Sequence, residues 1–282
     1  MSLTSRTHEA GFPIFTLTDR DSEVVISAFG GQILSWTNNG VPIVFENRDR
    51  AIVDGKTAYR GGAPICFPYF GAGSLLPLGT TLEPKHGEAR TTVWESNIVE
   101  SDNAVVLKTT QPAGEGYGPT TFFCELTYRL HEGLNIFATI SNTGQNAAPF
   151  QFAVHTYWAA TKPSEARITG LGNRHLDNLR GLTEHREDDS SQPHPTPIDR
   201  IYLDSAPDLE LATESHRVEI KTEGTSGSVV WNPGPNHDLK DLGSPDFLCL
   251  ESGVIVSPID LQPGARHEVR IVYRAILHGA GS

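Results

Sequence analysis

Two residues that can exchange protons near neutral pH, His155 and Glu251, each follow a run of apolar, β-prone residues. His155 closes the run that begins at Phe150, and an unperturbed histidine has a pKa of about 6.5. Glu251 follows the apolar residues that begin at Phe247, and burial raises the pKa of a carboxyl group. Such a pair could act as general acid and general base. The pattern leaves open that His155 is a core histidine bonded to a backbone carbonyl, and it does not show that the two residues meet.

A second group of residues could bind an anion. Arg60 precedes two glycines, and Arg90 ends a turn that contains Gly87, so the backbone beside both is tightly constrained. The planar fork of arginine suits the oxygens of phosphate or carboxylate. Lys85 could add a point charge, and His86 a polar contact. The alternative is that these are ordinary surface cations and that His86 is a cap.

The elements that must position these side chains are predicted to be strands. Residues 122–130 and 134–140 alternate between apolar and polar types on either side of a Glu–Gly turn, which indicates an antiparallel hairpin with one buried face. Further strands are predicted at 24–28, 32–36, 41–45, 104–107, 218–220, 229–231, 247–253 and 269–274. Many short strands with almost no helical periodicity indicate a large antiparallel β-sandwich with few short helices.

The polar stretch 173–198 contains several prolines and an acidic cluster. It is predicted to be a surface excursion within one domain that spans residues 1–282, because ordered structure resumes at 199–203. Its histidines, His175, His185 and His194, show no metal-ligand spacing and are assigned to a solvated loop.

The bulk composition excludes several classes of protein. The 282 residues include 22 basic and 34 acidic side chains, a net charge of −12, which disfavours nucleic acid and anionic membranes as partners. Three cysteines without a CxxC pair argue against a disulfide framework and a cysteine-rich zinc site, and they are compatible with the cytoplasm. We read no signal peptide and no transmembrane span. The sequence contains no phosphate-binding loop, Rossmann fingerprint, GxSxG or HExxH motif.

Six motifs nevertheless stand in a specific order. They are Arg60–Pro64 with Pro68–Gly71, His86–Arg90 with Trp94, Val154–Trp158, Asp199–Tyr202, Trp231–Pro233 and Glu251–Gly253. Their order and spacing resemble those of the glucose-6-phosphate 1-epimerases (hexose-6-phosphate mutarotases) of the aldose 1-epimerase superfamily, from about Gly30 to Tyr273. The resemblance implies a galactose-mutarotase-like β-sandwich.

The resemblance also implies roles for individual residues. His155 matches the general acid of the family and Glu251 its general base. Arg60 and Arg90 match positions that bind substrate, in this branch largely through the phosphate. Lys85 falls where the family usually has a polar residue, often Gln.

Two more positions match the family, and one departs from it. His86 and Asp199 match residues that contact sugar hydroxyls or orient the site. Glu88 departs from the usual Phe or Leu, and its carboxylate could face solvent or pair with a nearby arginine.

The implied reaction is ring opening and reclosure of a hexose 6-phosphate by acid and base, with no metal, nucleotide or covalent intermediate. An unphosphorylated aldose as substrate and a non-catalytic sugar-binding sandwich are the alternatives. The expected partner is a small sugar phosphate. The sequence does not give the oligomeric state, and a monomer is favoured.

Overall fold

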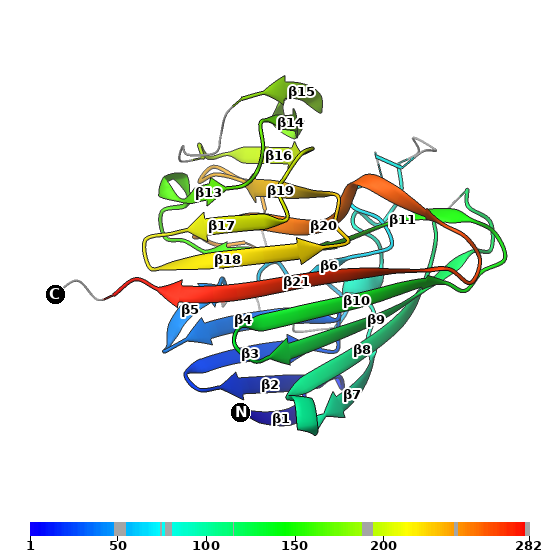
Figure 1. The fold of residues 1–282 in the computed structure, drawn as a ribbon, viewed down its shortest axis with the longest axis horizontal. Coiled ribbons are helices and arrows are strands. Elements are labelled where there is room, and N and C mark those ends of the chain that lie inside the picture. Colours follow the sequence, from blue (N-terminus) through cyan, green and yellow to red (C-terminus); the bar gives the residue numbers. More distant parts are fainter. Residues whose placement is uncertain are drawn as a thin grey trace.

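The computed structural model describes residues 1–47, 55–73, 75–76, 81–114, 116–187, 194–239 and 242–279. These residues form two antiparallel sheets, of 13 and 8 strands, as the alternating sequence pattern predicts (Figure 1). The described helical segments are four 3₁₀ turns: η1 (Ala89–Thr91), η2 (Glu100–Asp102), η3 (Pro163–Glu165) and η4 (Asn178–Arg180). The fold class predicted from the sequence is therefore confirmed. None of the described helices has the length and apolar character needed to span a membrane.

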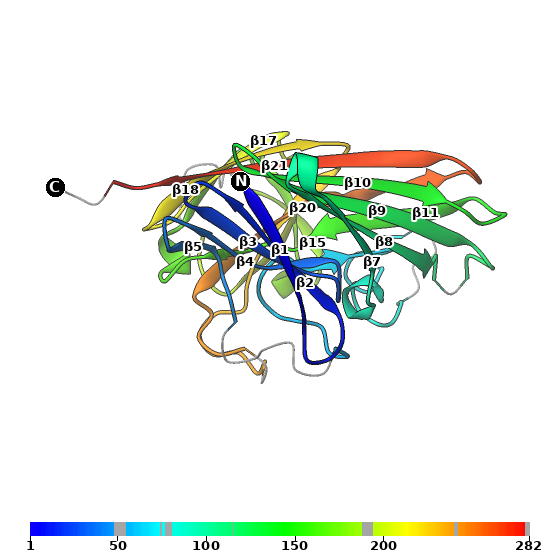
Figure 2. The same cartoon turned by 90° about the horizontal axis from the view of Figure 1, so that it is seen from below.

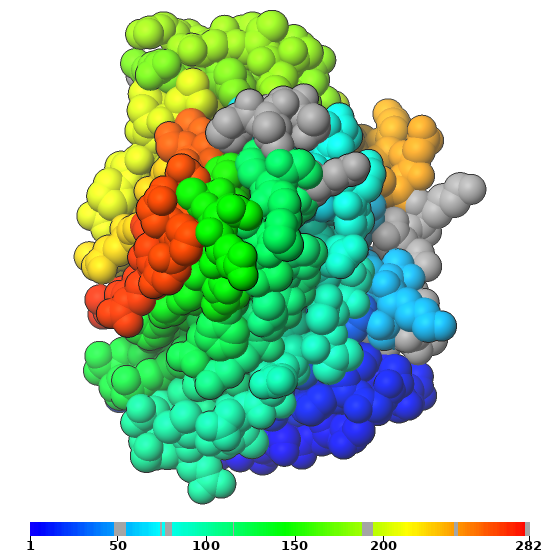
Figure 3. Space-filling model, turned by 90° about the vertical axis from the view of Figure 1, so that its right-hand side faces the viewer, coloured from blue at the N-terminus to red at the C-terminus, as the bar shows by residue number. Residues whose placement is uncertain are grey.

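The 13-stranded sheet, called the large sheet below, contains the strands that flank His155 and the strand that carries Glu251. In spatial order it consists of β1 (Ser2–Thr7), β2 (Pro13–Asp19), β3 (Ser22–Ser27), β4 (Gln32–Asn38), β5 (Val41–Val44), β12 (Tyr157–Ala159), β20 (Phe247–Leu261), β19 (Gly227–Asn232), β16 (Ile198–Tyr202), β14 (Arg174–Asp177) and β15 (Thr183–Arg186). Two strands lie off this path: β11 (Ala148–Val154) pairs with β20 and with β6 (Ile65–Cys66). The N-terminal strands lie at one end of the molecule and the β14–β15 hairpin at the other (Figure 3).

The 8-stranded sheet, called the small sheet, packs on one face of the large sheet (Figure 2). Its order is β13 (Arg167–Thr169), β17 (Asp208–Ala212), β18 (His216–Glu223), β21 (Arg266–Leu277), β10 (Leu134–Asn142), β9 (Thr121–Leu130), β8 (Ala104–Pro112) and β7 (Glu95–Val99). Strands β9 and β10 form the predicted hairpin. The alternate residues Phe122, Leu126 and Leu130 are buried, as the sequence pattern requires.

The main hydrophobic core fills the space between the two sheets. Trp36 and Trp158 reach it from the large sheet, and Phe122, Tyr128 and Tyr273 reach it from the small sheet. Trp158 and Tyr273 meet edge to face with ring centroids 4.9 Å apart, a favoured geometry for aromatic pairs. The small sheet therefore covers one face of the large sheet. Loops seen in cyan and orange in Figure 2 lie on its other face.

The predicted end of the strand at Gly253 is wrong, because β20 continues to Leu261. Gly253 does not stop the strand but permits a close approach to β11. A Cβ atom built at Gly253 would lie 1.9 Å from the carbonyl oxygen of Phe152. Glu251 thus lies within a 15-residue strand, not at its end.

Most described residues of the stretch 173–198 lie at the surface, as predicted, but the expectation that ordered structure resumes only at 199–203 is wrong. Residues 174–186 form the β14–β15 hairpin, which extends the large sheet through β16. His175 and His194 are buried, so they do not lie in a solvated loop. Residues 188–193 of this stretch lie outside the described part of the chain.

We expect Gly253→Ala to lower the free energy of unfolding by about 3 kcal/mol or more, because the new methyl group would collide with the Phe152 carbonyl. Gly264→Ala is the control, since its Cβ meets no atom within 4 Å and only its positive φ of 75° opposes the change, at a cost of about 1 kcal/mol. Urea unfolding followed by tryptophan fluorescence measures both. Equal losses in the two variants would contradict the close approach of β11 and β20.

Candidate active site

A cavity of about 470 Å³ lies on the face of the large sheet that the small sheet does not cover. This size falls in the range of small-molecule sites. All seven residues singled out from the sequence line it: Arg60, Lys85, His86, Arg90, His155, Asp199 and Glu251. Residues far apart in the chain therefore meet in one place.

Alternate residues of three neighbouring strands form the floor of this cavity. Asp199 of β16 pairs with Trp231 of β19, and Val229 of β19 pairs with Glu251 of β20. All four line the cavity. Because successive strand residues point to opposite faces, the intervening Val230 lies in the core between the sheets. The period of two thus places the side chains of Asp199 and Glu251 on the cavity side of the strands, together with those of Val229 and Trp231.

His155 occupies a two-residue gap between β11 and β12. Its backbone N–H donates to the carbonyl oxygen of Pro64 at 2.9 Å. Its ring stacks on Tyr157 at a centroid distance of 4.9 Å and meets Trp231 edge-on at 6.0 Å. These contacts fix the direction of the imidazole.

The imidazole and the carboxyl group face one another. Nε2 of His155 lies 3.4 Å from Oε1 of Glu251. His155 is 9% exposed and Glu251 is 1% exposed. Nδ1 of His155 and Oε2 of Glu251 have no hydrogen-bond partner among the described residues. The pair is therefore largely shielded from solvent, and each residue retains one atom that can still form a hydrogen bond.

Burial shifts the two pKa values in opposite directions. It lowers the pKa of His155 to about 3, with further lowering by the positive charges of Arg90, Arg60 and Lys85. It raises the pKa of Glu251 well above its usual range, with help from the negative charge of Asp199 and against the effect of Lys85. Both shifts favour the uncharged form of each group, with the proton on the carboxyl group of Glu251 rather than on the imidazole.

His86 presents a defined tautomer. Its Nδ1 accepts a hydrogen bond from the backbone N–H of Gly71 at 3.1 Å, so Nε2 carries the hydrogen. Burial and the neighbouring His155 lower its pKa well below the usual value. The ring lies 5.6 Å from that of His155, centroid to centroid. His86 is thus a neutral N–H donor beside the catalytic candidates.

The three cations that line the cavity come from segments between strands, and Arg90 lies in the 3₁₀ turn η1. Lys85 is exposed, whereas Arg60 and Arg90 are partly buried. The guanidinium of Arg90 donates to the carbonyl oxygen of Lys85 and closes the turn between them. Glu88, the departure from the family pattern, is exposed and lines a separate, smaller hollow. Its carboxylate therefore does not enter the cavity.

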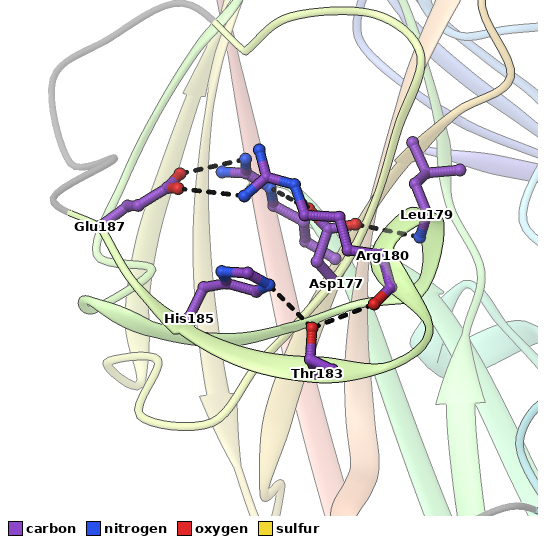
Figure 4. Close-up of polar contacts among 7 residues, drawn as sticks. Asp177, Leu179, Arg180, Thr183, His185 and Glu187 are labelled. Atoms are coloured by element: carbon purple, nitrogen blue, oxygen red, sulfur yellow. Dashed lines mark hydrogen bonds and ion pairs between the residues drawn. The ribbon is translucent and has the colours of Figure 1, made fainter.

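Asp199 is held by a residue that the sequence did not single out. The amide nitrogen of Asn178 donates to Oδ2 of Asp199 at 2.8 Å, and Asn178 lines the cavity. Behind it, Asp177 and Glu187 form ion pairs with two arginines, one of which is Arg180 (Figure 4). Asn178 was missed because its stretch is polar and rich in turn-forming residues, a pattern that predicts solvent exposure.

Trp231 is the other feature only partly anticipated. From residue type alone, all four tryptophans are expected to pack in the core, and Trp158 or Trp231 could also stack on a sugar. Trp36, Trp94 and Trp158 are fully buried, and Trp231 lines the cavity. Stacking on a ligand is therefore open to Trp231, and among the described tryptophans it alone has this position.

One group of side chains could hold a metal ion. Candidate ligand atoms of His155, Cys249 and Glu251 lie within 4.8 Å of one another, and all three residues are buried. Two of the three are the acid/base candidates, so a cation bound there would displace the proton that they share.

Comparison with known proteins points to one family. The aldose 1-epimerase family model matches residues 13–274. A protein of Cenchrus ciliaris is 30% identical over 275 residues, 89% of this chain and 80% of its own. One of Salmonella typhimurium is 28% identical over 240 residues, 81% of this chain and 79% of its own. Both carry the name "Putative glucose-6-phosphate 1-epimerase".

Solved structures show the same fold. A Synechocystis protein superimposes with a TM-score of 0.79 at 22% identity, covering 97% of both chains. A galactose mutarotase-like protein from Clostridium acetobutylicum gives 0.74 at 16% identity, covering 98% of both chains. Because the family match runs through both sheets and includes every residue of the cavity described above, this chain belongs to the aldose 1-epimerase family.

Proposed function

We propose that this protein is a hexose-6-phosphate 1-epimerase, with glucose 6-phosphate as the first substrate to test. The observation that carries the proposal is the 3.4 Å contact of His155 with Glu251 in a cavity that Arg60, Lys85 and Arg90 also line. The buried pair can move protons, and the cations can receive a phosphate group. The names of the relatives support the same substrate class.

The reaction follows from the chemistry of a cyclic hemiacetal. Glu251, as a carboxylate, takes the proton of the anomeric hydroxyl, and His155, as an imidazolium, gives a proton to the ring oxygen. The bond between C1 and the ring oxygen breaks, and the open-chain aldehyde forms. Rotation about the C1–C2 bond presents the other face of the carbonyl. On closure each residue reverses its role, so the pair ends as it began.

The phosphate of the substrate would prepare the pair for this reaction. The ion pair needed for ring opening has its proton on His155, whereas the cations favour the proton on Glu251 by lowering the pKa of His155. All three cations lower the pKa of His155, and among them only Lys85 acts on Glu251. A bound dianion that cancels these charges therefore favours the imidazolium more than it disfavours the carboxylate.

The family name favours a second candidate, a mutarotase of unphosphorylated aldoses that uses the same pair. In that case the three cations would contribute little to turnover. A non-catalytic sugar-binding protein would have no need of a buried pair with opposed pKa shifts.

We also propose a cytoplasmic location. The three cysteines are all free and buried, as is usual for proteins of a reducing compartment. A small sugar phosphate is the proposed partner, and the net charge of −12 disfavours nucleic acid and anionic membranes.

We expect His155→Asn and Glu251→Gln each to lower the rate of anomer exchange by about 10²–10⁴-fold, because each removes one proton-transfer group. NMR exchange spectroscopy of glucose 6-phosphate anomers measures the rate with and without protein. An unchanged thermal unfolding midpoint is the control for folding. Exchange at the wild-type rate in either variant would reject the assigned role.

We expect Arg60→Gln to raise KM for glucose 6-phosphate by about 10–100-fold, because a charge-assisted contact to phosphate is lost. The same variant should exchange glucose anomers within about threefold of the wild-type rate, since glucose has no phosphate. The two substrates are compared by the same NMR experiment. An equal loss for both sugars would favour the unphosphorylated aldose as natural substrate.

We expect the imidazole of His155 to stay neutral well below pH 6.5 in the free protein, since its pKa is lowered to about 3. Saturating inorganic phosphate should raise this pKa, because the anion cancels the positive charges that lower it. Titration of the histidine ring signals by NMR, assigned with His155→Asn, tests both statements. A downward shift on adding phosphate would contradict the proposed coupling.

A further inference from the structure

Asn178 begins the 3₁₀ turn η4 and is the one residue of that turn that lines the cavity. Its side-chain amide donates to Oδ2 of Asp199 at 2.8 Å. Asp199 lies on β16 and is followed directly by Arg200, whose side chain is 8% exposed. Neighbouring residues of a strand point to opposite faces. Asp199 therefore lies on the cavity face of β16, called the front below, and Arg200 lies on the opposite face, called the back.

Ion pairs connect the back of β16 to β14 and to the turn η4. Arg200 is the direct cross-strand partner of Asp177, and its Nε lies 3.5 Å from Oδ2 of Asp177. The same oxygen is 3.5 Å from Nε of Arg180. Glu187 joins the two guanidinium groups, at 3.1 Å from Arg200 and 3.5 Å from Arg180.

The carboxylate of Asp177 also sets the start of the turn itself. Its Oδ1 accepts the backbone N–H of Leu179 at 3.0 Å (Figure 4). This is an N-terminal capping bond, and it fixes the backbone on both sides of Asn178. The ion pairs at the back of β16 therefore determine where the Asn178 amide points at the front.

Other charged and titratable groups act on the two carboxyl groups of the cavity. Those that act on Asp199 are Lys85 and Asp177. Those coupled to Glu251 are Asp199, Lys85, His155, Cys66, Cys249, Tyr157 and Tyr273. Asp199 is the strongest charged influence on Glu251 and raises its pKa.

We propose that Asn178 is a positioning residue for the epimerisation: it holds the Asp199 carboxylate as an anion in the cavity that Glu251 lines, and the ion pairs of Arg200 and Arg180 hold Asn178 in place. The statement about the reaction rests on the proposed function, whereas the statement about the carboxylate does not.

The hydrogen bond determines the charge on Asp199. Burial raises the pKa of Asp199, and the N–H donated by Asn178 lowers it, because a donor stabilises the charged form. β19 separates β16 from β20, and Asp199 and Glu251 pair with residues two positions apart on β19, so their Cα atoms lie roughly 12 Å apart by strand spacing and rise. At that distance a negative charge in a protein shifts a pKa by about one unit. Asp199 thus makes Glu251 a stronger base.

The test compares Asn178→Ala, Asp199→Asn and the double variant by ¹³C NMR titration of the carboxyl groups in the whole protein. Asp199→Asn should lower the pKa of Glu251 by about one unit. Asn178→Ala should raise the pKa of Asp199 and lower that of Glu251 by a smaller amount. The double variant should match Asp199→Asn alone, since Asn178 acts through Asp199.

Asn173→Ala is the matched control, an exposed asparagine of the same stretch whose carbonyl oxygen accepts the backbone N–H of Glu187. It should leave both titrations unchanged, and Asn178→Gln, which keeps the amide donor, should restore part of the shift. Wild-type titrations in Asn178→Ala, or a further shift of Glu251 in the double variant, would overturn the proposal.

The pH dependence of kcat/KM for anomer exchange gives the second readout. The basic limb should move to lower pH in Asn178→Ala and further in Asp199→Asn, because Glu251 then loses more readily the one proton that the pair needs. If the carboxyl titrations shift as expected and the wild-type protein exchanges no anomers, the proposed function fails and the role of Asn178 toward Asp199 stands. If exchange is present and the titrations do not move, the positioning role fails.

Discussion

The site depends on one arrangement, a buried imidazole and a buried carboxyl group that face one another in the cavity. A lone buried charge is strongly disfavoured, and a pair that holds one proton between two groups avoids it. His155 and Glu251 meet this condition at 3.4 Å. Their remaining nitrogen and oxygen have no partner among the described residues, so both atoms are available to form a hydrogen bond with a bound molecule.

The arrangement requires a fixed register in the large sheet. β20 pairs with β19 on one side and with β11 and β12 on the other. A slip of one residue would turn Glu251 into the core and bring Leu250 to the cavity. Pairing on both edges prevents this, and the close approach of Gly253 to Phe152 ties β20 to the strand that leads to His155.

Much of the fold follows from the sequence, because alternation with a period of two is a local signal. It correctly predicted the β9–β10 hairpin and the strand over 269–274, which lies within β21. The prediction failed where the structure of a segment depends on contacts with residues distant in the sequence. Gly253 looks like a strand end, but it is required by the neighbouring strand. Residues 174–186 look solvated, but ion pairs and the edge of a sheet order them.

The same distinction applies to the site. His155, Glu251 and the three cations were singled out by residue type and by motif order, and the cavity brings them together. Asn178 was not, because its importance comes from a hydrogen bond to a residue 21 positions away. No pattern in the polar stretch distinguishes it from its neighbours. The size of the pKa shifts could not be predicted from the sequence either, because it depends on how deeply the folded protein buries each group.

Every described residue that lines the cavity comes from the large sheet or its loops, and the small sheet contributes none. The small sheet therefore contributes to the core without contributing a side chain to the cavity. Substitutions on the solvent side of the small sheet can accumulate without the loss of activity that often accompanies gains in thermal resistance. The small sheet can therefore change in sequence, by engineering or by neutral evolution, while the residues that line the cavity stay the same.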